Sequence, residues 1–298
     1  MTGIIIRSLS GFYDIDCEGQ LIRCRARGKL RYKKQKPLVG DRVELTIINE
    51  EEGALDMILP RTNVMDRPAV ANMDQLILVA SGAIPVTDTF LIDRMTALAE
   101  TKQCEPIILF NKWDLAPVPE LAELYEKAGY RVIRCSALTG LGMDEIREVI
   151  RDKVSVFTGN SGVGKSSILN ALDEGFNIPT GDISQKLGRG RHTTRHVELF
   201  RLPGNALVAD TPGFAAFDLQ TPELMDRFTL AEQFREVRPY LEDCAFVDCA
   251  HVKEKGCSLL AALKEGKIAQ SRHESYVRLY DQAKEYRPWE NKNKDERS

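Results

Sequence analysis

Residues 158–167 combine glycines, a lysine and serines at the spacing of a phosphate-binding loop, and their core fits the pattern Gly-x4-Gly-Lys-Ser. In such a loop the glycines let backbone N–H groups point at phosphate oxygens, the lysine reaches the terminal phosphates, and the serine hydroxyl binds Mg²⁺. An ordinary glycine-rich loop is the alternative, but a predicted strand precedes the segment and a predicted helix follows it, as the motif requires. We therefore predict a nucleotide-binding loop made of Gly159, Asn160, Ser161, Gly162, Val163, Gly164, Lys165, Ser166 and Ser167.

Residues 111–114 read Asn-Lys-Trp-Asp and directly follow a predicted strand. A carboxylate at Asp114 can accept from both the N1–H and the exocyclic amine of guanine. Adenine offers neither donor and would leave the carboxylate unpaired, so Asp114 is expected to select GTP over ATP. Ser136 and Ala137 follow the next predicted strand, where the Ala137 N–H could support the base. The predicted base-binding residues are Asn111, Lys112, Asp114, Ser136 and Ala137.

A third motif, Asp-Thr-Pro-Gly at residues 210–213, follows another predicted strand. Asp210 is expected to hold Mg²⁺ through water, and the Gly213 N–H to sense the γ-phosphate. The preceding segment, residues 181–196, is rich in Gly, Arg, Ser and Thr, so either Thr193 or Thr194 could close on the same ion. Each short motif alone is weak evidence for a function, but together with the phosphate-binding loop the motifs indicate a GTPase. The predicted Mg²⁺ residues are Ser166, Thr193, Thr194 and Asp210.

A separate cluster near the C-terminal end consists of Cys244, Cys249, His251 and Cys257. Three thiolates and one imidazole suit a closed tetrahedral Zn²⁺ site with no position left for water, so we predict one structural Zn²⁺. Buried thiols that happen to lie close together are the alternative.

Alternating strands and helices are expected to position the GTPase motifs. From residue 73 onward the pattern predicts strands at 75–80, 106–110, 130–134, 153–157, 196–202 and 206–209, with helices at 89–101, 119–129, 142–153 and from 166. This is an α/β domain with a mainly parallel sheet, whose ligands bind at the carboxyl ends of the strands. The base-binding motifs precede the phosphate-binding loop, whereas Ras-like GTPases have the opposite order. The domain is therefore predicted to be circularly permuted.

The first part of the chain has short β-rich runs at 4–6, 20–24, 42–48 and 54–59, which predict a small barrel. Cations recur at every second residue in its middle, and a solvated polar face or an RNA-binding face would both explain them. Phe12, Tyr13 and Tyr32 could offer stacking surfaces beside them. Residues 63–71 look like a linker. The RNA-binding candidates are Arg23, Arg25, Arg27, Lys29, Arg31, Lys33 and Lys34.

The overall composition of the chain limits which cellular locations and which classes of partner are expected. Its 298 residues carry a net charge of -3, so affinity for nucleic acid has to come from a local patch. The longest apolar run, residues 76–86, is too short to span a bilayer, and no secretory signal is visible. We expect a cytoplasmic monomer without a membrane partner.

The permuted motif order and the cysteine cluster resemble those of the RsgA (YjeQ/YloQ-type) ribosome-assembly GTPases, and the resemblance covers essentially the whole chain. It implies an N-terminal OB-fold at residues 1–68, a circularly permuted Ras-like P-loop GTPase domain at 69–217 and a C-terminal helical zinc-binding domain at 218–298. It also implies GTP hydrolysis to GDP and phosphate during late maturation of the small ribosomal subunit. The subunit and its rRNA would stimulate hydrolysis, and hydrolysis would drive release.

The resemblance also assigns the catalytic residues. Residues 190–194 match the family motif Gly-x-His-Thr-Thr, and Phe214 stands where many GTPases carry a water-orienting Gln. His192 therefore becomes the catalytic candidate beside Lys165 and Gly213, with an RNA contact as its alternative role. Because the 210–213 motif leads into the C-terminal region, loss of the γ-phosphate is expected to move the zinc domain. A nucleotide-gated RNA-binding module and a GTPase acting on another RNA, such as tRNA, are the alternative functions.

Overall fold

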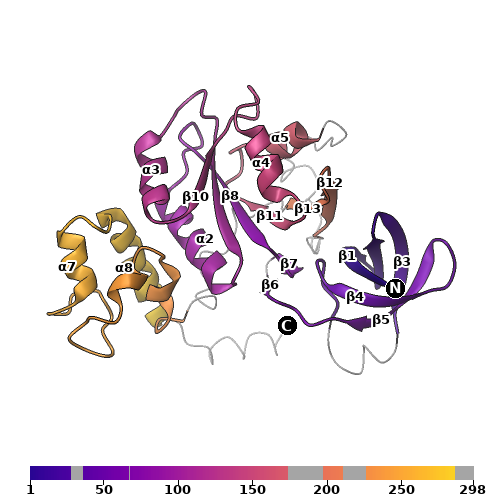
Figure 1. Cartoon of the computed structure of the whole chain (residues 1–298), viewed down its shortest axis with the longest axis horizontal. Coiled ribbons are helices and arrows are strands. Elements are labelled where there is room, and N and C mark those ends of the chain that lie inside the picture. The colour runs from indigo at the N-terminus through magenta and orange to yellow at the C-terminus, as the bar shows by residue number, and fades with distance from the viewer. Residues whose placement is uncertain (28–35, 67, 174–196, 211–225, 286–298) are drawn as a thin grey trace.

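The computed structural model describes residues 1–27, 36–66, 68–173, 197–210 and 226–285. These residues form three packed units, a small β-barrel, a central sheet covered by helices, and a helical unit near the C-terminal end. The barrel and the helical unit lie on opposite sides of the central sheet (Figure 1). Within the described residues, no helix is long and apolar enough to cross a membrane.

The barrel confirms the prediction for the first part of the chain. Five strands close in the order β1-β2-β3-β5-β4. In β3 the side chains alternate, so that Ile22 and Cys24 face the core while Arg23 and Arg25 face outward. The strands are β1 (Thr2–Leu9), β2 (Phe12–Cys17), β3 (Gln20–Ala26), β4 (Arg42–Ile47) and β5 (Glu52–Ile58).

The segment expected to be a linker is a short hairpin instead, with β6 (Val64–Asp66) paired to β7 (Ala69–Ala71). Met65 and Val70 are fully buried against the central sheet, which explains why the segment is ordered. The Asn63 side chain donates to the carbonyl of Met73 and accepts from its N–H, both at 2.8 Å. The linker prediction was therefore wrong, because the apolar residues of the segment have a core to enter.

The central sheet has the order β10-β9-β8-β11-β13-β12, and all neighbouring strands are parallel except β12 and β13. This arrangement confirms the predicted mainly parallel sheet. The carboxyl ends of the parallel strands all lie at one edge, where the predicted motifs follow them. The strands are β8 (Gln75–Ser81), β9 (Glu105–Asn111), β10 (Arg131–Arg134), β11 (Val154–Thr158), β12 (Leu199–Leu202) and β13 (Ala206–Asp210).

Helices cover both faces of the sheet, and the alternation of side chains in β8 shows how. Leu76 and Leu78 belong to the core beneath α2 (Thr89–Thr101) and α3 (Pro119–Lys127). Ile77 and Val79 belong to the core beneath α4 (Met143–Ile150) and α5 (Lys165–Leu172). The apolar residues of β8 therefore alternate between two apolar layers, one on each face of the sheet.

The C-terminal unit combines short turns with two helices. Residues 230–240 form two 3₁₀ turns, η3 (Leu230–Gln233) and η4 (Arg238–Tyr240), separated by Phe234, which takes an extended backbone conformation. The helices are α7 (Ser258–Lys264) and α8 (Gln270–Glu285). Their buried faces enclose a separate apolar core around Phe234, Leu259 and Tyr276.

Candidate nucleotide and metal sites

The predicted phosphate-binding loop joins β11 to α5, and its glycines are required by its shape. Gly159, Gly162 and Gly164 have φ angles of 135°, 78° and 97°, which disfavour residues with a side chain. A Cβ atom on Gly159 would lie 2.2 Å from the Val79 carbonyl oxygen, and one on Gly164 would lie 2.3 Å from Asn111 Nδ2. The loop can therefore pass close to the ends of β8 and β9 only with glycine at these positions.

Lys165 lies across this loop. Its ammonium group donates to the carbonyl oxygens of Gly159 at 2.8 Å and Asn160 at 2.9 Å. Lys165 and Ser166 form the first turn of α5, where backbone N–H groups and the helix dipole favour an anion. The cation, the hydroxyl and the helix terminus thus converge where a phosphate group would bind.

Asn111 is buried and ties the phosphate-binding loop to the predicted base-binding loops. Its Nδ2 donates to the Val163 carbonyl at 2.8 Å, and its Oδ1 accepts from the Ala137 N–H at 3.1 Å. Only 3% of Asn111 is exposed, whereas Asp114 is exposed on the turn that follows β9. The Asn111 amide is already paired with protein atoms. The side chain left open to bind a base is therefore the exposed carboxylate of Asp114.

Lys112 makes a second connection between the loops. Its Nζ donates to the Gly162 carbonyl and to the Ile84 carbonyl, both at 2.8 Å. Ile84 belongs to the loop after β8, which lies outside the predicted nucleotide-binding motifs. The available signal was Gly82 and Pro85 directly after a buried strand, at the same sheet edge as the other motifs.

Ser136 is almost fully buried, with 1% exposure, and shapes the loop that presents Ala137. Its N–H donates to the Leu141 carbonyl at 3.0 Å, and its hydroxyl oxygen accepts from the Thr139 N–H at 3.2 Å. The side chain therefore holds the turn and leaves the Ala137 backbone to face the site.

The other predicted phosphate and Mg²⁺ residues are only partly covered by the structure. Asp210 ends β13, and its backbone pairs in register with Phe157 of the neighbouring β11. This register places the Asp210 backbone beside the phosphate-binding loop, as a shared Mg²⁺ site with Ser166 requires. His192, Thr193, Thr194 and Gly213 lie outside the described residues.

The predicted metal cluster is brought together by the fold. Cys244, Cys249, His251 and Cys257 place their ligand atoms within 4.8 Å of one another. His251 Nδ1 lies 3.5 Å from Cys244 Sγ and 3.4 Å from Cys257 Sγ, and these two sulfur atoms are 3.8 Å apart. Tetrahedral Zn²⁺ with ordinary bond lengths separates its sulfur and nitrogen ligands by roughly 3.5 to 3.8 Å. The residues present therefore fit a zinc ion.

Helix α8 supports the backbone of the metal cluster. His273 Nε2 is 2.8 Å from the His251 carbonyl oxygen, and the Tyr276 hydroxyl donates to the Ala250 carbonyl at 2.7 Å. Burial lowers the pKa of His251, which favours the neutral imidazole that a metal needs. Cys104 and Cys135 are buried elsewhere in the fold and do not belong to this cluster.

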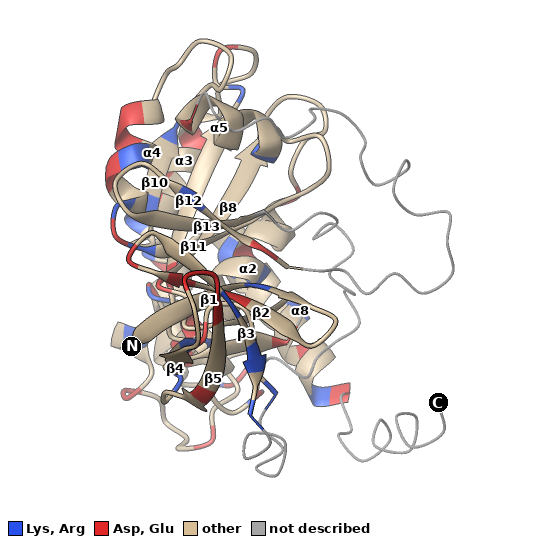
Figure 2. Ribbon diagram, turned by 90° about the vertical axis from the view of Figure 1, so that its right-hand side faces the viewer, with Lys and Arg blue, Asp and Glu red and all other residues tan. Residues whose placement is uncertain are grey.

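The predicted RNA-binding face is only partly described, and its described part has mixed charge (Figure 2). Arg23 and Arg27 face outward as predicted, but each pairs with a carboxylate, of Asp14 and Asp56 respectively, at 2.9 Å. The Arg25 guanidinium stacks 4.3 Å above the Phe12 ring. Lys29, Arg31, Lys33, Lys34 and Tyr32 lie outside the described residues.

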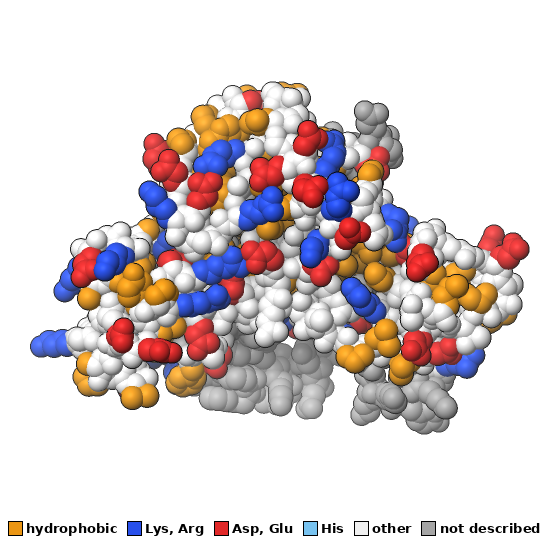
Figure 3. Space-filling model, in the orientation of Figure 1, with side chains coloured by type: hydrophobic (Ala, Val, Ile, Leu, Met, Phe, Trp, Pro, Cys, Tyr) orange, Lys and Arg blue, Asp and Glu red, His pale blue; other side chains and the backbone are white. Residues whose placement is uncertain are grey.

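Two further observations qualify this interface. Tyr13 has 8% exposure and belongs to the barrel core, so it cannot stack on a base as expected. Figure 3 shows acidic and basic side chains interspersed over all three units on the face it presents. That face therefore carries no single-sign surface.

Comparison with known proteins supports the same interpretation. Residues 58–220 match the model of the RsgA GTPase family, and residues 2–55 match the RsgA N-terminal domain. The small ribosomal subunit biogenesis GTPase RsgA of Caldanaerobacter subterraneus is 43% identical over 286 residues, covering 95% of this chain and 96% of the relative. Its counterpart in Geobacillus kaustophilus is 44% identical over 292 residues, covering 96% and 98%.

Two solved structures share the whole architecture. The crystal structure of YjeQ from Thermotoga maritima matches with a TM-score of 0.82 and 34% identity, over 96% of this chain and 99% of that chain. YloQ, described as a circularly permuted GTPase, matches with a TM-score of 0.78 and 34% identity, over 96% of both chains. The permuted order of the motifs, the parallel sheet that gathers them and these matches together show that this chain belongs to the RsgA GTPase family.

Proposed function

We propose that this chain hydrolyses GTP while bound to the small ribosomal subunit and thereby assists a late step of its maturation. One observation carries the proposal. The sheet brings the phosphate-binding loop and the two base-binding loops to one edge, where Asn111 of the first base-binding loop bonds to Val163 of the phosphate-binding loop and to Ala137 of the second base-binding loop. The names of the relatives, small ribosomal subunit biogenesis GTPase, support the choice of partner. Neither alternative function, the nucleotide-gated RNA-binding module or the GTPase acting on another RNA such as tRNA, has a comparable observation in its favour.

Guanine recognition rests on Asp114 in this proposal. Its exposed carboxylate accepts from N1–H and the exocyclic amine. The Ala137 N–H bonds to Asn111 Oδ1 in this structure, so it would donate to the base carbonyl only by exchanging that acceptor. Asn111 and Lys112 position the loops, because their polar atoms bond to the phosphate-binding loop. Selectivity against adenine follows from leaving the Asp114 carboxylate without a donor.

Phosphate binding is assigned to the loop amides from Gly159 to Ser167, with Lys165 on the terminal phosphates. Ser166 and Asp210 would hold Mg²⁺ together with a hydroxyl of Thr193 or Thr194. When bound, the ion offsets negative charge on the β- and γ-phosphate oxygens. The contribution of the protein is to fix the phosphates in line with the attacking water.

For the attack itself we propose His192 as the residue that orients water and Gly213 as a donor to the γ-phosphate. Phe214 follows the Asp-x-x-Gly motif and cannot hydrogen-bond to water, so the site lacks the usual Gln. Hydrolysis by the chain alone should be slow, and contact with the subunit should complete the arrangement.

A structural Zn²⁺ is proposed for Cys244, Cys249, His251 and Cys257, whose ligand atoms lie at distances that fit a tetrahedral ion. All four positions are filled by protein, so the ion stabilises the fold and does not activate water. We also propose domains at residues 1–68, 69–217 and 218–298; the two family models match residues 2–55 and 58–220. We propose that the two outer domains contact rRNA, and that the protein acts as a cytoplasmic monomer.

A multiple-turnover assay with purified small subunits tests the proposed reaction. We expect the subunits to raise the rate of GTP hydrolysis, and Lys165→Ala to abolish both nucleotide binding and turnover. Lys127→Ala is a matched control, because Lys127 is an exposed lysine on α3 that pairs with Glu123. Retention of nucleotide binding and turnover by Lys165→Ala would refute the phosphate site.

Co-sedimentation with subunits under GTP, GDP and a non-hydrolysable analogue tests the partner. The GTP and analogue forms should bind more tightly than the GDP form. Equal affinities would contradict hydrolysis-driven release, and preferential competition by tRNA would favour the alternative RNA. Binding with no stimulated turnover would favour a nucleotide-gated binding module.

A further inference from the structure

The loop between β8 and α2, residues 82–87, contacts the nucleotide site without belonging to any of its motifs. It begins at Ser81, which ends β8, and leads to Asp88, whose side chain caps α2 by accepting from the Phe90 N–H at 3.0 Å. The loop therefore starts at the same sheet edge as the phosphate-binding and base-binding loops.

Two buried hydroxyl residues close the neck of this loop. The Ser81 N–H donates to Thr87 Oγ1 at 3.0 Å, and the Thr87 N–H donates to the Ser81 carbonyl at 2.9 Å. Ser81 has 3% exposure and Thr87 has 5%, so both hydrogen bonds are shielded from water. The neck fixes the distance between the end of β8 and the start of α2.

The tip of the loop is held by polar contacts and not by burial of its own apolar residues. Ile84 and Val86 are 88% and 64% exposed, so their side chains contribute little packing. Instead, the Ile84 carbonyl accepts from Lys112 Nζ at 2.8 Å. The shape of the tip depends on the neck and on this lysine.

Through the same contacts the loop holds both halves of the nucleotide site. Lys112 Nζ also donates to the Gly162 carbonyl, and the Pro85 ring lies so near that a Cβ on Gly162 would be 3.3 Å from its Cδ. On the other side, a Cβ on Gly82 would lie 2.6 Å from the Ala116 carbonyl oxygen, just after the Asn-Lys-Trp-Asp motif. The loop is thus packed between the phosphate-binding loop and the base-binding loop.

We propose that loop 82–87 positions the nucleotide site and that Thr87 is a positioning residue for nucleotide binding. Thr87 holds the neck of the loop and thereby the position of the Ile84 carbonyl. That carbonyl positions the Lys112 ammonium, which in turn bonds to Gly162 and so positions the amides of the phosphate-binding loop. Without the Thr87 hydroxyl, the buried Ser81 N–H loses its acceptor and the neck has to open to satisfy it. The inference rests on the proposed guanine nucleotide site.

The test compares release of a fluorescent GDP analogue from the full-length chain and its variants, well below the unfolding temperature. Thr87→Val keeps the side-chain shape but removes the acceptor, and we expect release about fivefold to tenfold faster. Thr87→Ser restores the hydroxyl and should return the rate close to that of the original chain. Thr101→Val is the matched control, because it removes a hydroxyl that bonds to the Ala97 carbonyl at the far end of α2.

A purely structural role for Thr87 would lower the unfolding temperature without changing the release rate. A positioning role also predicts that the release rates of GDP and of inosine diphosphate (IDP) rise by the same factor. The reason is that the substitution leaves unchanged the Asp114 carboxylate, which binds the guanine amine. If Thr87→Val fails to fold, Pro85→Ala removes the ring beside Gly162 and should speed release about twofold. Unchanged release in whichever variant folds overturns the inference, whereas failure of the original chain to bind GDP refutes the proposed function itself.

Discussion

The two units that flank the central sheet are attached to it by contacts of different kinds. The barrel reaches the sheet through β1 and the edge strand β12, where Arg7 pairs with Glu198 and Arg201 pairs with Asp16. The Arg7 and Arg201 side chains are 44% and 37% exposed. The C-terminal unit is attached through α2, and its central cation, Arg272, is only 1% exposed.

Arg272 of α8 is the centre of the C-terminal attachment. It pairs with Asp93 of α2 and with Glu236, both at 2.6 Å, and the Tyr125 hydroxyl donates to the same Asp93 carboxylate at 2.6 Å. The guanidinium lies within 5.5 Å of the ring centres of Tyr125, Tyr130 and Phe234. A buried charge paired on several sides in this way fixes one geometry, because any displacement leaves carboxylates unpaired.

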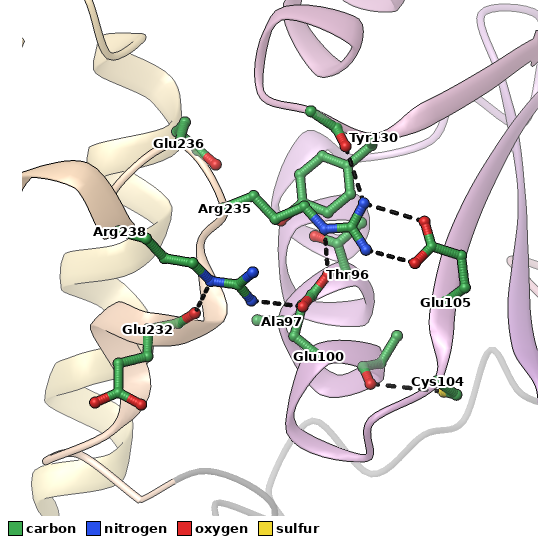
Figure 4. A network of polar contacts seen from close by, with 12 residues as sticks. Thr96, Ala97, Glu100, Cys104, Glu105, Tyr130, Glu232, Arg235, Glu236 and Arg238 are labelled. Atoms are coloured by element: carbon green, nitrogen blue, oxygen red, sulfur yellow. Dashed lines mark hydrogen bonds and ion pairs between the residues drawn. The ribbon is translucent and has the colours of Figure 1, made fainter.

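A second set of ion pairs extends this attachment toward the surface (Figure 4). Arg235 bonds to Glu100 of α2 and to Glu105 of β9, at 2.7 Å for the latter, and its guanidinium stacks 5.0 Å from the Tyr130 ring. Arg238 shares Glu100 at 2.6 Å. The C-terminal unit therefore contacts the sheet as well as the helix that covers it.

This difference changes the expected route of nucleotide-dependent movement. Hydrolysis was expected to move the C-terminal unit, but that movement relative to α2 would have to break a buried ion-pair network. Movement of the barrel breaks the ion pairs with Glu198 and with Arg201 of β12, and it also separates Ile4 and Ile6 from the apolar core of the sheet, but among the described residues no ion pair buried on both sides is lost. In sequence β12 lies between the predicted switch threonines and Asp210. We therefore expect the barrel to change position more readily than the C-terminal unit. Each of the following variants tests one side of that comparison.

Loss of the proposed zinc ion should have the largest effect. Cys257→Ser removes one ligand of the cluster, and structural zinc contributes on the order of 10 kcal/mol to the folding of small zinc units. We expect the variant to bind no zinc and α7 to become disordered, while the central sheet still binds GDP. Metal analysis and hydrogen exchange of the C-terminal unit measure both effects.

Cys104→Ser is the control for this change, because Cys104 is buried away from the cluster. It should keep a full complement of zinc. A Cys257→Ser protein with normal zinc content and unchanged protection of α7 would show that the cluster consists of ordinary buried thiols.

Removal of the buried cation should have the next largest effect. Arg272→Met keeps much of the side-chain volume but leaves Asp93 and Glu236 without their cation, which costs about 3 to 5 kcal/mol for buried pairs. The transition that unfolds the C-terminal unit should move to lower denaturant concentration, and α2 should lose protection from hydrogen exchange with it.

Arg278→Met serves as the matched control on the same helix. Arg278 is exposed and stacks 3.7 Å from the Phe90 ring, a contact worth roughly 0.5 to 1 kcal/mol at the surface. Equal effects of the two substitutions would mean that burial of Arg272 does not determine how the unit is attached.

Much of the fold could be predicted because the motifs are local and lie at strand ends. Asn111 and Lys165 identify the site through their neighbours in sequence, so the sheet that joins them follows from alternating strands and helices. The barrel strand β2 was missed because Asp14 and Asp16 give it the composition of a loop. Their partners, Arg23 and Arg201, become neighbours only in the fold.

The roles of individual residues within the site were harder to predict. The sequence could not show that the Asn111 amide is used up by Val163 and Ala137, since both partners come from other loops. Loop 82–87 was missed for the same reason, because its contact with Lys112 is made by a backbone carbonyl that any residue could supply. Contacts made through the backbone leave no trace in residue type.

Loss of an ion pair on the barrel side should have the smallest effect. Arg201→Ala removes a partly exposed partner of Asp16, whose carboxylate still accepts from the Gly19 N–H at 2.7 Å. Fully exposed pairs contribute about 0.2 to 1 kcal/mol. Asp16 is only 7% exposed, so the unfolding free energy of the barrel should fall by about 1 to 2 kcal/mol, still less than for Arg272→Met.

Arg201→Ala should change the position of the barrel more than its stability. X-ray scattering of Arg201→Ala should show a larger radius of gyration, because the barrel is then held to β12 by fewer contacts, and high salt should produce a similar increase in the original chain. Arg131→Ala removes a more exposed pair with Glu145 inside the GTPase unit, at 3.4 Å, and should leave the radius unchanged. If Arg201→Ala destabilised the protein as strongly as Arg272→Met, the two attachments would be equivalent, and the barrel could not be the more easily displaced unit.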